Sequence, residues 1–147
     1  TGDCGLLTME KYKYFLPLRV RFAETDLQGH VFFGHYLTYF DEALTGYTRA
    51  IGCSYQELLA MSVDMFYIRA ECEFKSRAFF DEVLNVHARV GQIGNSSITF
   101  EFAAHKEHND ELVATGKIVA VIIDPQTKKP VRVPEVFRDA VARYENP

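Results

Sequence analysis

The spacing of apolar residues changes along the chain, and each change marks a different predicted element. From residue 15 to 22 apolar side chains alternate with Pro17 and two arginines, which predicts a strand with one buried face that includes Phe22. Because proline cannot donate to a β-ladder, Pro17 indicates an edge strand or a strand start. Residues 35–51 then carry apolar side chains at spacings of three and four, so we predict one long helix that stops at Gly52.

A period of two returns after a short helix. Ser54 and Glu57 match a capping box, so a short helix is predicted to run through Met61. Turn-rich segments separate the strands that follow, which predicts antiparallel hairpins in a meander. The last of these strands ends in an unbroken apolar run, which predicts a central strand covered on both sides. The four predicted strands are 66–74, 84–90, 98–104 and 112–123.

The strand at 66–74 is predicted to have two unlike faces. Its alternate positions carry Tyr67, Arg69 and two glutamates, which suit a more polar side. The other positions are predicted to share one apolar face, and they are Phe66, Ile68, Ala70, Cys72 and Phe74.

Strands and helices are segregated along the chain, and this order predicts the fold class. We expect an α+β domain in which an antiparallel sheet of about five strands packs on one long helix. A further helix, opened by Pro134, is expected at the C-terminal end. Residues 1–147 are interpreted as a single domain, because this length supports one core. Residues 1–10, which include Cys4, are expected to be disordered or not native to the protein and carry no functional argument.

Composition and charge exclude several classes of function. The 16 basic and 20 acidic residues leave a formal net charge of -4, which disfavours a nucleic-acid partner. No apolar run approaches the ~20 residues of a membrane span, and no signal peptide is recognisable, so we predict a cytoplasmic protein with no membrane partner. The scattered cysteines form no CxxC pair, which argues against a disulfide framework or a zinc site. Cys53 and Cys72 have no base partner in the sequence and are expected to be buried and inert.

The entrance of the predicted long helix has no obvious capping side chain. Phe32, Phe33, Gly34 and His35 stand there, and neither phenylalanine nor glycine can accept a hydrogen bond through a side chain. The first amides of a helix lack intrahelical partners and carry roughly half a positive charge. We therefore predict that the amides from Phe33 onward hold a ligand oxygen, with Gly34 allowing close approach.

Asp26 precedes this entrance in a loop that Gly29 is expected to fold back toward the helix. A carboxylate and unpaired amides beside one carbonyl group suit acyl transfer to water. The amides would stabilise the developing oxyanion, and the carboxylate would act as base or nucleophile. The residues alone leave a simpler alternative open, in which Asp26 only stabilises a turn.

The stretch "RVRFAETDLQGHVFFGHYLTYFDEALTGY" resembles the signature of hotdog-fold acyl-CoA thioesterases of the 4-hydroxybenzoyl-CoA thioesterase type. In that signature an acid and a glycine precede the long helix, and a tyrosine lies in its first turn. "FKSRAFFDEVLNVHARV" is similar to a later stretch of the same family. The resemblance spans most of residues 15–124 and implies a sheet wrapped around its helix. It also implies hydrolysis of an acyl thioester of coenzyme A, or of acyl carrier protein, without a metal or redox cofactor.

The same resemblance implies roles for particular residues. Asp26 would be the catalytic carboxylate, as nucleophile or as general base, and the Phe33 amide would polarise the thioester carbonyl. Some relatives carry a histidine at the position that matches Phe33, and in this chain His30 and His35 are the nearby candidates for its role. The active site would lie between two subunits of a homodimer or homotetramer. The predicted substrate-binding residues are Gly29, His30, Gly34, His35, Tyr36, Lys75 and Arg77, the last two for the phosphates of coenzyme A.

Alternatives remain for both the acid and the function. Asp41 and Glu42 lie on the helix, where a second group of hotdog thioesterases keeps its acid. His105, His108 and Asp110 are interpreted as part of a hairpin turn, because their spacing does not match a helical metal motif. A non-catalytic acyl-thioester-binding or ligand-sensing hotdog module is the rival function. A hydratase or dehydratase of the same architecture is the third alternative.

Overall fold

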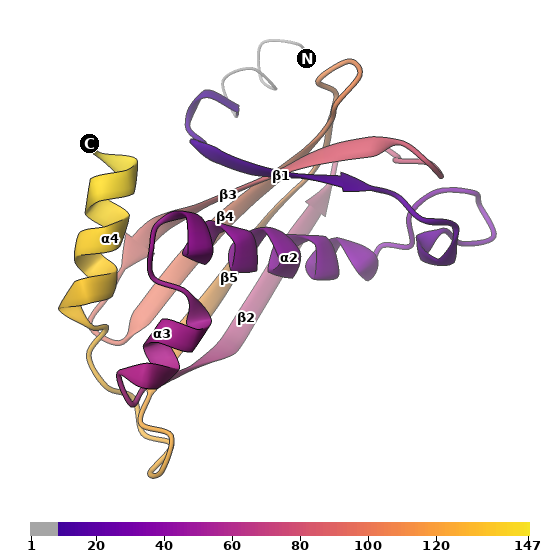
Figure 1. The fold of residues 1–147 in the computed structure, drawn as a ribbon. Helices are drawn as coiled ribbons and strands as arrows, with labels where there is room; N and C mark the ends of the chain where they lie inside the picture. Colours follow the sequence, from indigo (N-terminus) through magenta and orange to yellow (C-terminus); the bar gives the residue numbers. More distant parts are fainter. Residues whose placement is uncertain (1–8) are drawn as a thin grey trace.

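The computed structural model describes residues 9–147, which form a five-stranded antiparallel sheet packed on the long helix α2 (Figure 1). The predicted α+β class is confirmed. Cys4 lies outside the described residues, as does most of the segment 1–10. The strands are β1 (Tyr14–Arg19), β2 (Asp64–Phe74), β3 (Val83–Ile93), β4 (Ser97–Lys106) and β5 (Leu112–Ile123). The helices are the short 3-10 helix η1 (Phe22–Glu24), α2 (His35–Ala50), α3 (Tyr55–Ala60) and α4 (Glu135–Glu145).

Helix α2 supplies much of the aromatic core. It packs on β1, β2 and β3, and the ring of Phe40 stacks on Phe102 of β4 with centroids 4.9 Å apart. Burying one such side chain contributes about 1.5–3 kcal/mol. Among residues 9–147, no helix is both long and apolar enough to cross a membrane. The buried residues of α2 are Tyr36, Tyr39, Phe40, Ala43, Leu44, Gly46, Tyr47 and Thr48.

The position of β2 differs from the predicted meander. The sheet order is β1-β3-β4-β5-β2, so β3, β4 and β5 form consecutive hairpins whereas β2 pairs with β5. Helix α3 leads into β2 and packs against it, which places the strand at the β5 edge of the sheet. Residues 75–82 then return the chain to the opposite side (Figure 1). The prediction of four strands in a meander is therefore wrong for β2.

A bulge divides β2 into two parts. The register shifts between Tyr67 and Arg69, which leaves Ile68 as an additional residue. An extra residue reverses the alternation of side chains along a strand, so residues before and after the bulge do not keep the faces that simple alternation assigns. The prediction that Phe66 and Ile68 share a face with Ala70, Cys72 and Phe74 is therefore wrong. Tyr67 faces α2 instead, and its hydroxyl donates a hydrogen bond of 2.6 Å to Asp41 Oδ1.

The first strand is an edge strand, as Pro17 indicated, but it ends earlier than predicted. β1 stops at Arg19 because the chain turns into η1, and the side chain of Phe22 is 78% exposed. The predicted burial of Phe22 is therefore wrong, while Val20 is buried as expected. The main chain of Val20 bonds to the turn before β3, since its amide donates to Glu82 O at 2.9 Å.

Strand β5 lies inside the sheet, between β4 and β2, but only one of its faces is well covered. Ile118, Ala120 and Ile122 are buried on the side that faces α2, while Val119 and Val121 are only partly buried. The predicted cover on both sides is therefore wrong, because α2 covers only one of the two faces.

Candidate active site

The entrance of α2 is not capped by any side chain, as predicted. The His35 amide donates to Phe32 O at 3.0 Å, and the Tyr36 amide donates to Phe33 O at 3.3 Å. Within residues 9–147, the amides of Phe33 and Gly34 have no hydrogen-bond partner. Two donors at the positive end of the helix are therefore open to an oxygen atom.

The loop before this entrance is closed by its own backbone. The Asp26 amide donates to His30 O at 3.0 Å, and the Gly29 amide donates back to Asp26 O at 2.9 Å. Gly29 has a φ of 84°, a left-handed conformation that glycine adopts without strain. Thr25 and Val31 pair across the base of the loop. These bonds hold Asp26 next to the segment His30–Val31, which leads into Phe33.

The Asp26 carboxylate makes one hydrogen bond within the loop. Its Oδ1 accepts from the Gln28 amide at 2.9 Å, which is the pattern of an Asx turn. No other atom of residues 9–147 bonds to the carboxylate, so Oδ2 is available. The side chain is partly buried. The turn-stabilising role that the sequence left open is therefore present, and it occupies only one of the two oxygens.

A cavity of about 320 Å³ lies beside the helix entrance. It brings together parts of the loop, the first turn of α2 and the segment that follows β2. Four of the predicted site residues, Asp26, Gly29, Gly34 and His35, are not among its lining residues. The cavity is lined by Gln28, His30, Val31, Phe33, Tyr36, Phe74, Lys75, Ser76 and Arg77.

The two candidate histidines have different surroundings. Nδ1 of His30 lies 3.1 Å from Val31 O, and Nε2 lies 2.9 Å from Gln28 Oε1. These bonds orient the ring along the loop at the cavity wall. His35 packs edge-on against the ring of Phe32, with centroids 5.9 Å apart. His35, which was expected to help line the pocket, does not reach this cavity.

Tyr36 forms the inner wall of the cavity. Its side chain is buried, and it packs against Phe74 with ring centroids 5.6 Å apart. Burial raises the pKa of Tyr36 to about 12, so the phenol is neutral at physiological pH. Tyr36 therefore offers an apolar surface and an uncharged hydroxyl, not a base.

The basic residues at the cavity mouth are not equivalent. Lys75 Nζ lies 2.9 Å from Glu73 Oε2, so its charge is already partly neutralised. Arg77 is exposed and has no ion-pair partner within the described part of the chain. A guanidinium can bind a phosphate through two hydrogen bonds at once. Arg77 is therefore the cation best placed to meet an anionic ligand.

Glu24 is a buried carboxylate that the sequence analysis did not identify. Only 6% of the residue is exposed. Burial opposes ionisation, but hydrogen bonds from Arg21 and from Tyr39 outweigh it, so the pKa of Glu24 is lowered. The sequence offers one weak hint, the spacing of Arg21 and Glu24, and such pairs are common on solvated surfaces.

A model of the thioesterase-like superfamily matches residues 20–141, which include the Asp26 loop, α2 and the whole sheet except β1. The chain belongs to the thioesterase-like superfamily. The resemblance noted in the sequence is thereby confirmed, together with the hotdog fold and the assignment to an enzyme family of thioesterases.

Relatives of this thioesterase-family chain match it over almost their full length. A protein of Aquifex aeolicus (strain VF5) is 33% identical over 129 residues, which cover 82% of this chain and 94% of the relative. The acyl-CoA thioesterase YbgC of Haemophilus influenzae is 26% identical over 128 residues, with 86% and 93% covered. Among solved structures, a thioesterase of Thermus thermophilus in complex with coenzyme A and Zn is 25% identical, with a TM-score of 0.81. That match covers 95% of this chain and 98% of the Thermus protein.

Asp41, the alternative acid of this thioesterase-family chain, lies at a different cavity. This second cavity, of about 300 Å³, is formed between α2, α3 and β2. Asp41 accepts the hydrogen bond from Tyr67 there, and burial together with this bond raises the pKa of the Tyr67 phenol. Glu42 is exposed and lines neither this cavity nor the one beside Phe33.

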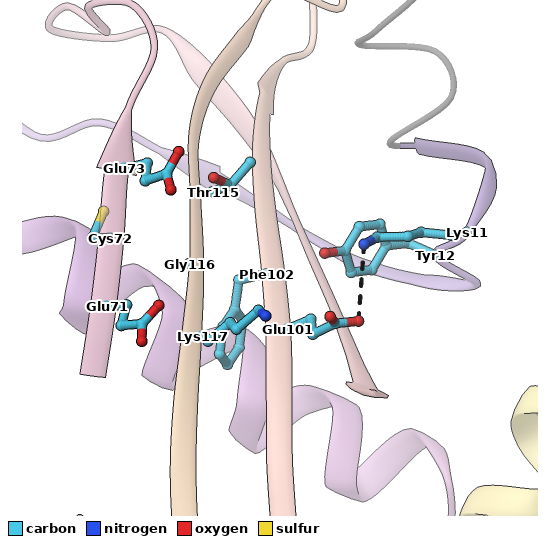
Figure 2. Close-up of a pocket in the computed structure, with 10 residues that line it drawn as sticks. All are labelled: Lys11, Tyr12, Glu71, Cys72, Glu73, Glu101, Phe102, Thr115, Gly116 and Lys117. Carbon is cyan, nitrogen blue, oxygen red and sulfur yellow. Dashed lines mark ion pairs between the residues drawn. The ribbon is translucent and has the colours of Figure 1, made fainter. Parts of the chain in front are cut away.

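A third cavity, of about 240 Å³, involves side chains from three adjacent strands (Figure 2). Glu71, Glu73 and Glu101 line it together with Lys11 and Lys117, and Lys11 Nζ lies 3.9 Å from Glu101 Oε1. The excess of carboxylates disfavours a phosphate there, and α2 contributes none of the lining residues. We therefore place the candidate active site at the α2 entrance.

The segment that carries His105, His108 and Asp110 is only partly a turn. His105 lies in β4 and pairs with Leu112 of β5, so the predicted turn position is wrong for this residue. His108 bonds to Glu82 Oε2 at 2.8 Å, while the ring of His105 is buried and packs against His87. Asp110 is exposed at the turn. Within residues 9–147, no group of three or more potential ligand side chains is arranged to hold a metal ion.

The two described cysteines show no sign of activation. Cys53 is buried, and burial raises the pKa of its thiol. Cys72 is only partly buried, so the prediction of full burial is wrong there, but the pKa of its thiol is raised to about 11, again mainly by burial. Both thiols are therefore protonated at physiological pH and poor nucleophiles.

Proposed function

We propose that this chain hydrolyses an acyl thioester of coenzyme A at the entrance of α2. The observation that carries the proposal is the pair of unpaired amides, of Phe33 and Gly34, at a helix start beside a cavity with Arg77. A helix start of this kind favours a developing negative charge, and an exposed guanidinium favours a phosphate. The name of the Haemophilus relative, an acyl-CoA thioesterase, supports the same substrate class.

In the proposed reaction the Phe33 amide binds the thioester carbonyl oxygen. Negative charge accumulates on that oxygen as the carbonyl carbon becomes tetrahedral, so preorganised donors lower the barrier. Removing one donor from such a site costs about 10²–10³ in rate. The helix dipole adds to the stabilisation, because its positive end faces the same oxygen.

Asp26 supplies the second half of the chemistry by one of two routes. As a general base it removes a proton from water while the water oxygen bonds to the carbonyl carbon, and the C–S bond then breaks. As a nucleophile its free oxygen displaces the coenzyme A thiolate, and water hydrolyses the resulting anhydride. In both routes the thiolate leaves and takes up a proton. The Oδ2 atom of Asp26 is the oxygen available for either role.

The cavity suggests how coenzyme A and its acyl group would bind. The phosphates would meet Arg77, with a weaker contribution from Lys75, whose charge is shared with Glu73. The acyl group would lie against the apolar wall that Tyr36 and Phe74 form. An acyl carrier protein would present the same thioester group. Comparing kcat/KM for the same acyl group on coenzyme A and on acyl carrier protein decides which carrier the chain uses.

We further propose that the active site is completed in a homo-oligomer, a dimer or a tetramer. Strand β2 forms an edge of the sheet and exposes large apolar side chains, including Phe66, Ile68 and Phe74. A long apolar edge strand is an open template for pairing with another chain. Phe74 ends β2 beside the candidate cavity, so a second copy on this edge would also approach the site.

Changing one exposed residue of β2 tests the oligomer. Ile68→Lys places a charge at the edge and is expected to shift the protein toward monomer in analytical ultracentrifugation. Val136→Lys is the matched control, because Val136 on α4 is 54% exposed and Ile68 is 63% exposed. If Ile68→Lys and the natural chain sediment alike, β2 is not the interface.

Thiol release from a panel of aryl, short-chain and long-chain acyl-CoA substrates tests the hydrolase itself. Asp26→Asn is expected to lower kcat by about 10²–10⁴, the range that a general base contributes. Asp41→Asn, which changes the alternative acid at the other cavity, is expected to have a much smaller effect. If the natural chain binds coenzyme A but turns over no thioester, the chain is a non-catalytic acyl-thioester-binding module.

A further inference from the structure

We infer that Glu24 is a positioning residue, which holds the Asp26 loop and the α2 entrance in one fixed arrangement. This inference rests on the proposed hydrolase function and adds a residue that touches neither the substrate nor the reacting atoms. Glu24 ends η1, immediately before the loop that carries Asp26, and Figure 1 shows this loop leading into the start of α2.

Both oxygens of the Glu24 carboxylate are fully engaged. Oε1 accepts from the Tyr39 hydroxyl at 2.9 Å and from the Arg21 amide at 2.8 Å. Oε2 accepts from Arg21 Nη2 at 2.8 Å and from Arg21 Nε at 3.2 Å. Tyr39 lies in the second turn of α2 and is almost completely buried. The side chain of Glu24 therefore ties the end of η1 directly to the helix.

The backbone of Glu24 makes a second connection, to the other arm of the loop. Glu24 O accepts a hydrogen bond of 2.9 Å from the Phe32 amide. Phe32 directly precedes Phe33, whose amide is the proposed oxyanion donor, and Asp26 follows Glu24 after one intervening residue. Glu24 is thus bonded to helix α2 and to the chain before and after the loop. The position of Glu24 therefore sets the spacing between Asp26 and Phe33.

The energetics favour a geometric role over a purely stabilising one. An ionised carboxylate is costly to bury unless it is paired and hydrogen-bonded, and apolar residues of similar volume often stabilise a fold as well. Directed hydrogen bonds, in contrast, select a single orientation. Glu24 makes four of them through its side chain, two of them to the guanidinium of Arg21. Orientation matters for catalysis, because a misplacement of about 1 Å can cost roughly 10² in rate.

Tyr39→Phe tests this inference with the smallest change. It removes the hydroxyl that bonds to Glu24 and keeps the buried ring. Tyr47→Phe is the matched control, because the Tyr47 hydroxyl is also on α2 and donates a hydrogen bond of 2.6 Å, to Glu145. Glu145 ends α4, away from the loop. Both variants lose a hydroxyl bond to a carboxylate, and Tyr47→Phe also removes the acceptor of the Val90 amide, which donates to the Tyr47 hydroxyl at 3.3 Å. Tyr47→Phe should therefore lose at least as much thermal stability as Tyr39→Phe.

The expected result is a separation of the two variants in kcat. Tyr39→Phe should lower kcat for acyl-CoA hydrolysis by roughly tenfold to a hundredfold, with a smaller change in KM. Tyr47→Phe should leave kcat close to that of the natural chain. Glu24→Gln, which keeps an oxygen acceptor for Tyr39, should lose less activity than Glu24→Ala. Equal losses of kcat in Tyr39→Phe and Tyr47→Phe would overturn the inference, because the role would then be structural only.

Amide hydrogen exchange supplies a readout that does not depend on turnover. Segment 25–34 should exchange faster in Tyr39→Phe than in the natural chain, and Tyr47→Phe should leave this segment unchanged. Unchanged exchange of the segment in Tyr39→Phe would refute the positioning role. A natural chain without thioesterase activity would refute the proposed function instead, and the exchange measurement would still show whether Glu24 holds the loop.

Discussion

The ring of Phe40 lies directly against the α-carbon of Gly116, where α2 crosses β5. A Cβ atom at position 116 would collide with that ring and would lie 2.7 Å from Glu71 O on the neighbouring strand. Phe40 cannot move aside easily, because it is fully buried and stacked on Phe102. The absence of a side chain at Gly116 therefore allows the long helix to pack this closely on the sheet.

Gly116→Ala is expected to destabilise the protein by roughly 1–3 kcal/mol, the usual cost of inserting a methyl group into a packed core. Urea unfolding followed by circular dichroism measures the loss. Gly94→Ala is the control, because the one close contact of a Cβ there would be with the hydroxyl of Ser97, a short side chain that can rotate, while the Ser97 backbone oxygen would lie at an ordinary contact distance of 3.8 Å. If the two variants unfold at the same urea concentration, the close packing of α2 on the sheet does not require a glycine at position 116.

Arg77→Ala is expected to raise KM for acyl-CoA about tenfold and to leave kcat nearly unchanged. A hydrogen bond to a charged group contributes about 1.5–3 kcal/mol, and an interaction made equally in ground and transition states affects KM alone. Lys75→Ala should have a smaller effect, since Lys75 is paired with Glu73.

An acyl-pantetheine is the control substrate for the Arg77→Ala experiment, because it has the thioester but lacks the coenzyme A phosphates. Arg77→Ala should not change KM for this substrate, and its effect on acyl-CoA should shrink at high salt as the charges are screened. An equal rise in KM for both substrates would show that Arg77 acts on something other than the phosphates.

Glu24 gives the protein an acid-sensitive component of stability. Because the pKa of Glu24 is lowered in the folded chain, the unfolded chain binds the proton more tightly. The stabilisation is therefore fully present above the ordinary glutamate pKa of 4.5 and is lost as pH falls through the lowered folded value. Thermal unfolding of the natural chain and of Glu24→Gln should differ most near neutral pH, and the difference should shrink below pH 4.5. A difference that does not depend on pH would contradict an ionised Glu24 in the folded chain.

Elements whose signals lie in neighbouring residues were predictable. The apolar spacing predicted a helix over 35–51, and α2 runs from His35 to Ala50. Ser54 caps α3 as its capping box indicated, since its hydroxyl accepts from the Glu57 amide at 3.3 Å. The uncapped entrance at Phe33 was predictable for the same reason, because it needs only a run of residues without acceptor side chains.

Features that depend on distant residues were not predictable. The place of β2 beside β5 follows from the packing of α3, and the bulge at Ile68 reverses the faces that a count of alternate residues assigns. Glu24 could not be identified from the sequence, because its partner Tyr39 belongs to a helix that only the fold brings beside it.

The sequence by itself therefore determined roughly where the five strands and the three longer helices lie, and which helix start is left open. Backbone preferences and side-chain periodicity act over a few neighbouring residues, so they can be recognised along the chain. Only the tertiary structure decided which strands pair, which side chains line the cavity beside Phe33, and which carboxylate holds the Asp26 loop to α2. Those outcomes depend on burial and on hydrogen bonds between residues far apart in the sequence, and their energies exist only once the chain has packed.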